Sequence, residues 1–189
     1  MKLLIAFGTT EGQTRKICEY IRDEAKKEGV TVSMSDTTGP HLQPKGFDAA
    51  VIAASVHYGE YQTSLEHFVE EHSDKLNQIP TLFLSVSLTA ASDEPESWKE
   101  LEQITAKFLE KTGWYPNDVE QVAGALRYSK YNFFKKFIMR LIAQKSGGST
   151  DTSKDHEYTD WAQVKNALMK LINYVEEKEQ ASADTSKVE

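Results

Sequence analysis

Residues 2–16 read Lys-Leu-Leu-Ile-Ala-Phe-Gly-Thr-Thr-Glu-Gly-Gln-Thr-Arg-Lys, an apolar run followed by a loop rich in glycine and threonine. The run 3–7 has no charged residue, which is typical of a strand buried on both faces of a parallel sheet. Gly8 ends the run, and a helical pattern begins at Thr14. The first turn of a helix leaves backbone N–H groups without partners, and the helix dipole attracts anions. The loop between strand and helix therefore predicts a phosphate site.

The kind of phosphate site follows from what this loop lacks. A nucleotide-hydrolysing P-loop ends in Gly-Lys-Ser/Thr, but position 13 is Gln13. A dinucleotide fold needs G-x-G-x-x-G, and Gly8 and Gly12 do not have that spacing. Neutral hydroxyl donors without a lysine favour a monophosphate, and residues 9–14 resemble the loop with which flavodoxins hold the phosphate of FMN. The alternative is an ordinary polar turn between a strand and a helix.

Composition excludes several other classes of protein. The chain has 189 residues, a formal net charge of −7 and a pI of about 5.3, which argues against a general nucleic-acid binder. Cys18 is the single cysteine, so no intramolecular disulfide forms and a reducing compartment is expected. There is no signal-peptide pattern, and no apolar run approaches the roughly 20 residues that span a bilayer. His67 and His72 lack the i, i+4 spacing of a helical metal pair. We expect a cytoplasmic protein without a metal site.

The remaining apolar runs predict four further strands, at 30–34, 48–54, 80–86 and 118–126. Helical patterns separate them, and a last helix is expected from 159 to about 177. This alternation predicts a doubly wound α/β domain with a five-stranded parallel sheet in the flavodoxin-like order 2-1-3-4-5. We expect one domain over 1–177, an insertion after strand five at 127–157, and a flexible polar tail at 178–189.

Three loops should meet at the carboxyl edge of this sheet, where open α/β sheets bind ligands. They are the phosphate loop and the segments at the ends of the strands 48–54 and 80–86. Tyr58 is expected to stack on a flat ligand, while His57 is either a ligand contact or a solvated loop residue. The predicted cofactor-binding residues are Thr9, Thr10, Glu11, Gly12, Gln13, Thr14, Ser55, Val56, His57, Tyr58, Gly59, Ser85, Val86, Ser87, Leu88 and Thr89.

The expected insertion is strongly basic over residues 127–146, with six cations and no acid. Apolar residues fall on one helical face near 131–145, and such a pattern suggests contact with a membrane surface or an acidic ligand. The alternative is a packed helix with a solvated charged face. The residues predicted to contact substrate or membrane are Arg127, Tyr128, Lys130, Lys135, Lys136 and Arg140.

Five motifs along the chain resemble the flavodoxin-like menaquinone-dependent protoporphyrinogen oxidases of bacterial haem synthesis. The three motifs nearest the C-terminus flank the insertion after strand five, which ordinary flavodoxins lack. Family members carry a basic residue at the position of His57 and a basic stretch where residues 91–100 are acidic here. The matching motifs are Gly12-Gln13-Thr14-Arg15, Ala54-Ser55 with Tyr58-Gly59, Ala123-Gly124-Ala125-Leu126-Arg127-Tyr128, Gly147-Gly148 with Thr150-Asp151-Thr152, and Tyr158-Thr159-Asp160-Trp161.

The resemblance implies an FMN enzyme that passes hydride equivalents from protoporphyrinogen IX to a quinone at the inner face of the cell membrane. No catalytic side chain is expected, because the flavin carries the redox chemistry. The alternative hypothesis is an electron-carrier flavodoxin that docks redox partners and has no substrate of its own. The acidic remainder of the chain favours the carrier, and the basic insertion favours the enzyme. The sequence does not indicate the oligomeric state.

Overall fold

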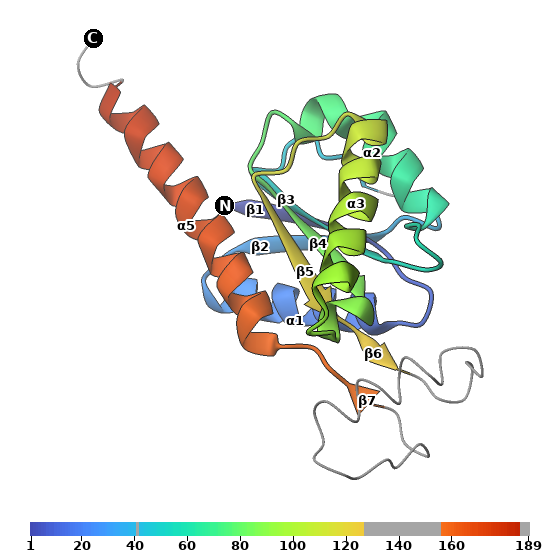
Figure 1. Cartoon of the computed structure of the whole chain (residues 1–189). Helices are drawn as coiled ribbons and strands as arrows, with labels where there is room; N and C mark the ends of the chain where they lie inside the picture. Colours follow the sequence, from blue (N-terminus) through green and yellow to red (C-terminus); the bar gives the residue numbers. More distant parts are fainter. Residues whose placement is uncertain (41, 127–155, 186–189) are drawn as a thin grey trace.

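The computed structural model describes residues 1–40, 42–126 and 156–185, and it is built on a five-stranded parallel sheet (Figure 1). The sheet strands are β1 (Lys2–Gly8), β2 (Thr31–Asp36), β3 (Ala49–Ser55), β4 (Thr81–Ser87) and β5 (Asp118–Ala123). The helices are α1 (Gln13–Lys27), α2 (Thr63–Leu76), the 3-10 turn η1 (Thr89–Ala91), α3 (Pro95–Thr112) and α5 (Trp161–Thr185). A short two-stranded ladder joins β6 (Ala125–Leu126) to β7 (His156–Glu157).

The strand order is β2-β1-β3-β4-β5, which confirms the predicted doubly wound topology. Strand β1 lies in the centre, and Leu3 pairs with Val32 of β2 and with Ala49 of β3. Parallel neighbours separated by helical crossovers place every carboxyl end at the same edge of the sheet. The expected meeting of the three loops at that edge follows from this order.

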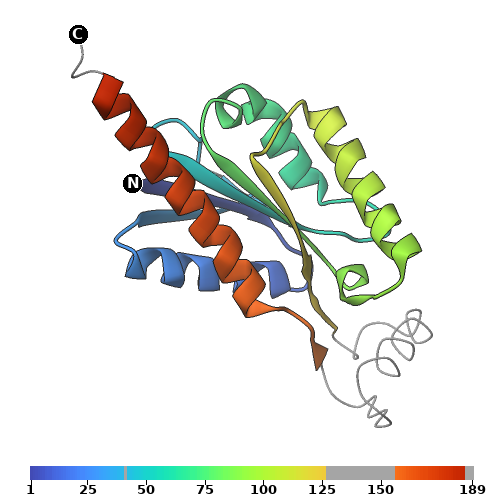
Figure 2. The same cartoon turned by 60° about the vertical axis from the view of Figure 1, so that its left-hand side comes forward.

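The helices form two layers, with α1 and α5 on one face of the sheet and α2 and α3 on the other (Figures 1 and 2). Alternate residues of β1 supply the two cores, because successive side chains of a strand point to opposite faces. Leu3 and Ile5 pack with Ile17 of α1, whereas Leu4 packs with Phe68 of α2. Burial on both faces explains why this strand has no polar alternation.

The last strand differs from its prediction as one element over 118–126. Strand β5 ends at Ala123, and the chain turns away from the sheet at Gly124. The N–H of Gly124 still donates to the carbonyl of Ser87 at 2.9 Å, and a β-carbon there would lie 3.4 Å from Val86 Cγ1. Beyond this contact, β6 pairs with the antiparallel β7 instead of with β4.

The final helix corrects the prediction of a tail from residue 178. Helix α5 continues to Thr185 and extends beyond the sheet (Figure 2). Residues 176–182 are exposed, and most are strong helix formers that need no packed face to continue a helix already started. The predicted basic helix at 131–145 lies outside the described residues, as do the six residues predicted to contact substrate or membrane.

Candidate functional site

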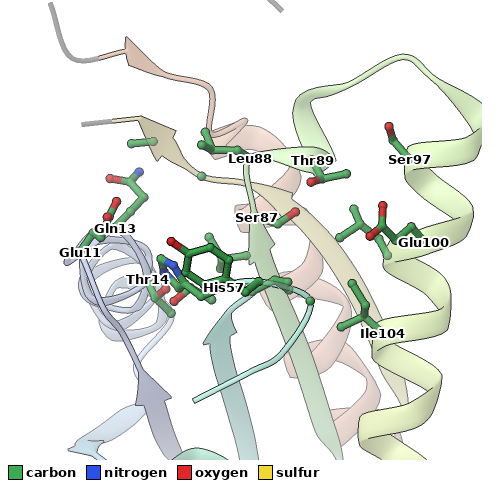
Figure 3. A pocket seen from close by; sticks show the side chains of 18 of the residues that line it. Glu11, Gln13, Thr14, His57, Ser87, Leu88, Thr89, Ser97, Glu100 and Ile104 are labelled. Atoms are coloured by element: carbon green, nitrogen blue, oxygen red, sulfur yellow. The ribbon is translucent and has the colours of Figure 1, made fainter. Parts of the chain in front are cut away.

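A cavity of about 430 Å³ opens at the carboxyl edge of the sheet, where the loops after β1, β3 and β4 converge (Figure 3). Its volume is within the range of small-molecule sites in proteins. The residues that line it are Thr9, Glu11, Gln13, Thr14, Ser55, Val56, His57, Tyr58, Gly59, Val86, Ser87, Leu88, Thr89, Glu94, Ser97, Glu100, Leu101, Ile104, Gly124 and Ala125.

One end of the cavity is the N-terminus of α1. Gly12 is the N-cap residue, has a φ of 91°, and donates its N–H to Thr9 Oγ1 at 3.0 Å. A glycine suits this left-handed conformation, and no side chain caps the helix. The first-turn N–H groups therefore remain to bind an anion, and the buried hydroxyl of Thr14 lies beside them.

Glu11 places a carboxylate beside this helix N-terminus. Its Oε1 atom is buried and has no hydrogen-bond partner among the described residues. A buried acceptor without a donor raises the free energy of the folded state. The loop 9–14 thus contains one carboxylate that would repel an anionic ligand.

A two-residue turn at Tyr58 and Gly59 forms a second wall. His57 and Glu60 exchange backbone hydrogen bonds of 2.8 and 3.1 Å, and both central residues have positive φ, 53° at Tyr58 and 80° at Gly59. Positive φ is uncommon for an aromatic residue and often marks a functional position. The Tyr58 side chain is 81% exposed at the cavity, which leaves its ring available to a ligand.

The structure brings most of the predicted cofactor-binding residues together, but not Thr10, Gly12 and Ser85. Thr10 accepts a hydrogen bond from Gln62 Nε2 at 3.1 Å. Gly12 caps α1 without lining the cavity. Ser85 is fully buried and accepts a hydrogen bond from the hydroxyl of Tyr61 at 2.8 Å. Its side chain therefore belongs to the core on the α2 and α3 face of the sheet.

Sequence reasoning missed the wall formed by α3. Ser97, Glu100, Leu101 and Ile104 line the cavity from this helix, on the side opposite to Glu11 and Gln13 (Figure 3). Their spacing of i, i+3, i+4 and i+7 is the signal of one helical face and was available in the sequence. Gly124 and Ala125 complete the lining after β5.

The cavity is acidic within the described part of the chain. Glu11, Glu94 and Glu100 contribute three carboxylates to its lining, and no lysine or arginine is among the described lining residues. Trp98, on the same helix, lines a separate groove with Thr105 and donates its indole N–H to the carbonyl of Ser92 at 2.7 Å.

Comparisons with known proteins identify the family. Residues 4–153 match the family model described as the flavodoxin domain. Protoporphyrinogen IX dehydrogenase (quinone) of Escherichia coli K12 is 38% identical over 177 residues, which are 92% of this chain and 96% of the relative. The chain belongs to this dehydrogenase family. A Leishmania major protein of the same name is 33% identical over 168 residues, 87% of this chain and 71% of the relative.

Membership of the dehydrogenase family makes the chain an oxidoreductase. Solved structures agree on the fold. An archaeal flavodoxin superposes with a TM-score of 0.54 at 14% identity, covering 93% of this chain and 99% of its own. A flavo-diiron protein of Thermotoga maritima gives the same score over 36% of its length. No helix in residues 1–40, 42–126 and 156–185 is long and apolar enough to cross a membrane.

Proposed function

We propose that the chain binds FMN and oxidises protoporphyrinogen IX to protoporphyrin IX, with a quinone as the electron acceptor, as a step of haem biosynthesis. The observation that carries the proposal is one cavity that joins a helix N-terminus to an apolar and aromatic wall, in a chain 38% identical to a named protoporphyrinogen IX dehydrogenase. The electron-carrier alternative has less support, because family membership makes the chain an enzyme.

The lining residues fit FMN at both ends of the cavity. The phosphate would be held by the first-turn N–H groups of α1 and the hydroxyls of Thr9 and Thr14. The ring would lie between the turn at 56–60 and the segment 86–89, with Tyr58 stacked on it. When bound, FMN supplies the hydride chemistry, and the protein supplies orientation and exclusion of water. The Oε1 atom of Glu11, which has no hydrogen-bond partner among the described residues, would oppose the phosphate.

The α3 wall suggests how a porphyrinogen would lie. Ile104 would offer an apolar surface to the tetrapyrrole beside the buried Leu101, whereas Glu94 and Glu100 would repel its propionates. The substrate would therefore enter with its propionates directed away from α3. This orientation keeps the apolar edge of the substrate close to the flavin ring.

A peripheral contact at the inner face of the cell membrane is also part of the proposal, because a quinone is lipid-soluble. The predicted basic segment 131–145 would supply it, since each cation near an anionic leaflet contributes about 1 kcal/mol. We expect salt-sensitive binding to anionic vesicles, weakened by the double change Lys135→Glu with Lys136→Glu. Deletion of 129–146 should abolish quinone-coupled turnover and leave FMN bound. Full quinone reductase activity in that deletion, with no vesicle binding by the intact chain, would contradict the membrane contact.

The deciding experiment is anaerobic absorbance spectroscopy of the purified full chain. We expect a flavin spectrum that protoporphyrinogen IX bleaches and a menaquinone analogue restores, with protoporphyrin fluorescence appearing in proportion. Thr14→Ala should weaken FMN binding by about 1–2 kcal/mol if it removes one hydrogen bond to a charged group. A flavin that only a protein redox partner reduces would favour the carrier, and a chain that binds no flavin would contradict the proposal.

A further inference from the structure

The N-terminus of α1 is bonded to a segment that lies far along the chain. Gln13 Nε2 donates to Thr159 Oγ1 at 2.9 Å, although 146 positions separate the two residues. The Thr159 hydroxyl in turn donates to the carbonyl of Ala123 at 2.7 Å. Thr159 is buried, whereas Gln13 lines the cavity. Three elements thus meet in one short relay at the phosphate end.

The number of hydrogens on each group fixes which atom donates in each hydrogen bond of this relay. A threonine hydroxyl has one hydrogen, and the carbonyl of Ala123 can only accept it. Thr159 Oγ1 can then only accept from Gln13, which fixes the amide nitrogen, and not the amide oxygen, toward Thr159. The other N–H of this NH2 group has no partner among the described residues, and it can donate to a ligand because Gln13 lines the cavity.

Neighbouring contacts hold Thr159 in place. The N–H of Tyr158 donates to the carbonyl of Gly124 at 3.0 Å, next to the β6–β7 ladder. Glu157 is ion-paired with Lys16 of α1 and accepts the indole N–H of Trp161 at 2.9 Å. The return segment 156–161 is therefore attached to α1 on both sides of Thr159, by the Glu157–Lys16 ion pair and by the ring of Trp161, which lies 4.8 Å from the ring of Tyr20.

We propose that Thr159 is a positioning residue for cofactor selectivity, acting through Gln13 so that the chain prefers FMN to riboflavin, which lacks the phosphate. The inference rests on the proposed FMN site and assigns a role to a residue that does not line the cavity. Gln13 donates to the phosphate, and Thr159 with Ala123 sets the orientation of its amide. Loss of the relay lets the amide rotate and lowers phosphate affinity without changing the ring site.

The test compares the dissociation constants of FMN and riboflavin for the flavin-free full chain. Thr159→Val keeps the side-chain shape and removes the hydroxyl, so FMN should bind about tenfold more weakly while riboflavin binding changes less than about twofold. Thr159→Ser is the matched control, because it keeps the hydroxyl and should retain wild-type selectivity. Gln13→Met should reproduce the selective loss while leaving the Thr159 bond to Ala123 intact, and the double variant should be no weaker than either single one.

Several results would overturn the inference. An equal loss of FMN and riboflavin affinity in Thr159→Val would indicate a purely structural role. Unchanged FMN affinity in either Thr159→Val or Gln13→Met would exclude the relay, and Gln13→Met decides the question if Thr159→Val does not fold. A wild-type chain that binds no flavin would overturn the proposed function together with this inference, whereas the other outcomes leave the proposed function intact.

Discussion

Tyr61 donates its buried hydroxyl to Ser85 Oγ at 2.8 Å, and Ser85 is next in sequence to Val86, which lines the cavity. Its single hydrogen is committed there, so Thr105 must donate to Tyr61 across 2.9 Å, and Gln121 Nε2 donates to Thr105. Burial raises the pKa of the Tyr61 hydroxyl, and the hydrogen bonds with Ser85 and Thr105 oppose this rise. This series of hydrogen-bonded side chains forms a polar row inside the otherwise apolar core on the α2 and α3 face of the sheet.

Tyr61→Phe should lower the free energy of unfolding by about 1–2 kcal/mol, because Ser85 loses a donor and Thr105 loses an acceptor in the core. FMN affinity should not change, since Tyr61 does not line the cavity. Urea unfolding and flavin titration measure the two effects. Tyr115→Phe is the control, because the Tyr115 side chain is 74% exposed. Weaker FMN binding with unchanged stability would contradict this assignment.

Tyr58→Asn should remove ring stacking from the flavin while suiting the left-handed backbone at this position better than tyrosine does. We expect the fluorescence of the bound flavin to be partly recovered relative to wild type. The binding free energies of FMN and of riboflavin should weaken equally, by about 0.5–1.5 kcal/mol. Tyr58→Phe keeps a ring and should retain the quenching. If Tyr58→Asn quenches as strongly as wild type, Tyr58 does not stack. Neither Tyr61 nor Trp98 could stack on the flavin ring in its place, because neither lines the cavity.

Glu11→Gln should strengthen FMN binding by about threefold to tenfold, because it removes a negative charge next to the phosphate and adds a donor. Riboflavin affinity should stay the same. The gain should be larger at low ionic strength, where charges are less screened. Glu19→Gln on α1 serves as the control, since Glu19 is not among the cavity-lining residues. Weaker FMN binding in Glu11→Gln would mean that the carboxylate accepts a hydrogen bond from the ligand.

Glu100→Gln should lower KM for protoporphyrinogen IX by up to about fivefold with little change in kcat, since an exposed charge contributes less than about 1 kcal/mol. The physical reason is weaker repulsion of the substrate propionates. Glu102 lies two residues along α3 and lines the other groove, so Glu102→Gln is the control and should have no effect on KM. An equal change in both variants would show that α3 acts only through its overall charge.

Glu24 on α1 should make stability depend on pH. Hydrogen bonds from Lys165 and Lys27 lower the pKa of this carboxyl from its ordinary value of 4.5. A lowered pKa in the folded state means that the stabilisation is present above the unfolded pKa and is lost as the pH falls through the folded one. The difference in unfolding free energy between wild type and Glu24→Gln should therefore shrink below about pH 4.5. Urea unfolding across this range, with Glu110→Gln as an exposed control, measures it. A constant difference would show that the two ion pairs of Glu24 do not couple stability to pH.

Much of the fold was predictable because the apolar runs are unambiguous. The runs 3–7 and 49–54 contain no charged residue, and a sheet covered on both faces buries such segments completely. The strand order then places three loops at one edge, so most of the cavity lining followed from topology. Ser85 was misplaced because a strand end does not reveal which residue is the last to be covered by the helix layer.

The remaining features depend on tertiary packing or on helix propensity, and the apolar runs do not mark them. Ser97 and Glu100 line the cavity from α3, which packs against α2 and η1. In the sequence, the helical spacing of the lining residues was the one indication of this wall. The end of β5 depends on the close approach of Gly124 to Val86. The length of α5 depends on helix propensity alone beyond Glu177, without an apolar stripe to mark it.

The β6–β7 ladder pairs the backbones of two residues that lie far apart in the sequence, with Leu126 opposite His156. Anchored ends of this kind limit the entropic cost of a long insertion, which grows only with the logarithm of its length. Segments of different length and sequence could therefore be exchanged between these two residues with little effect on the sheet. A protein engineer can thus vary the sequence between β6 and β7 while the sheet and the cavity at its carboxyl edge stay the same.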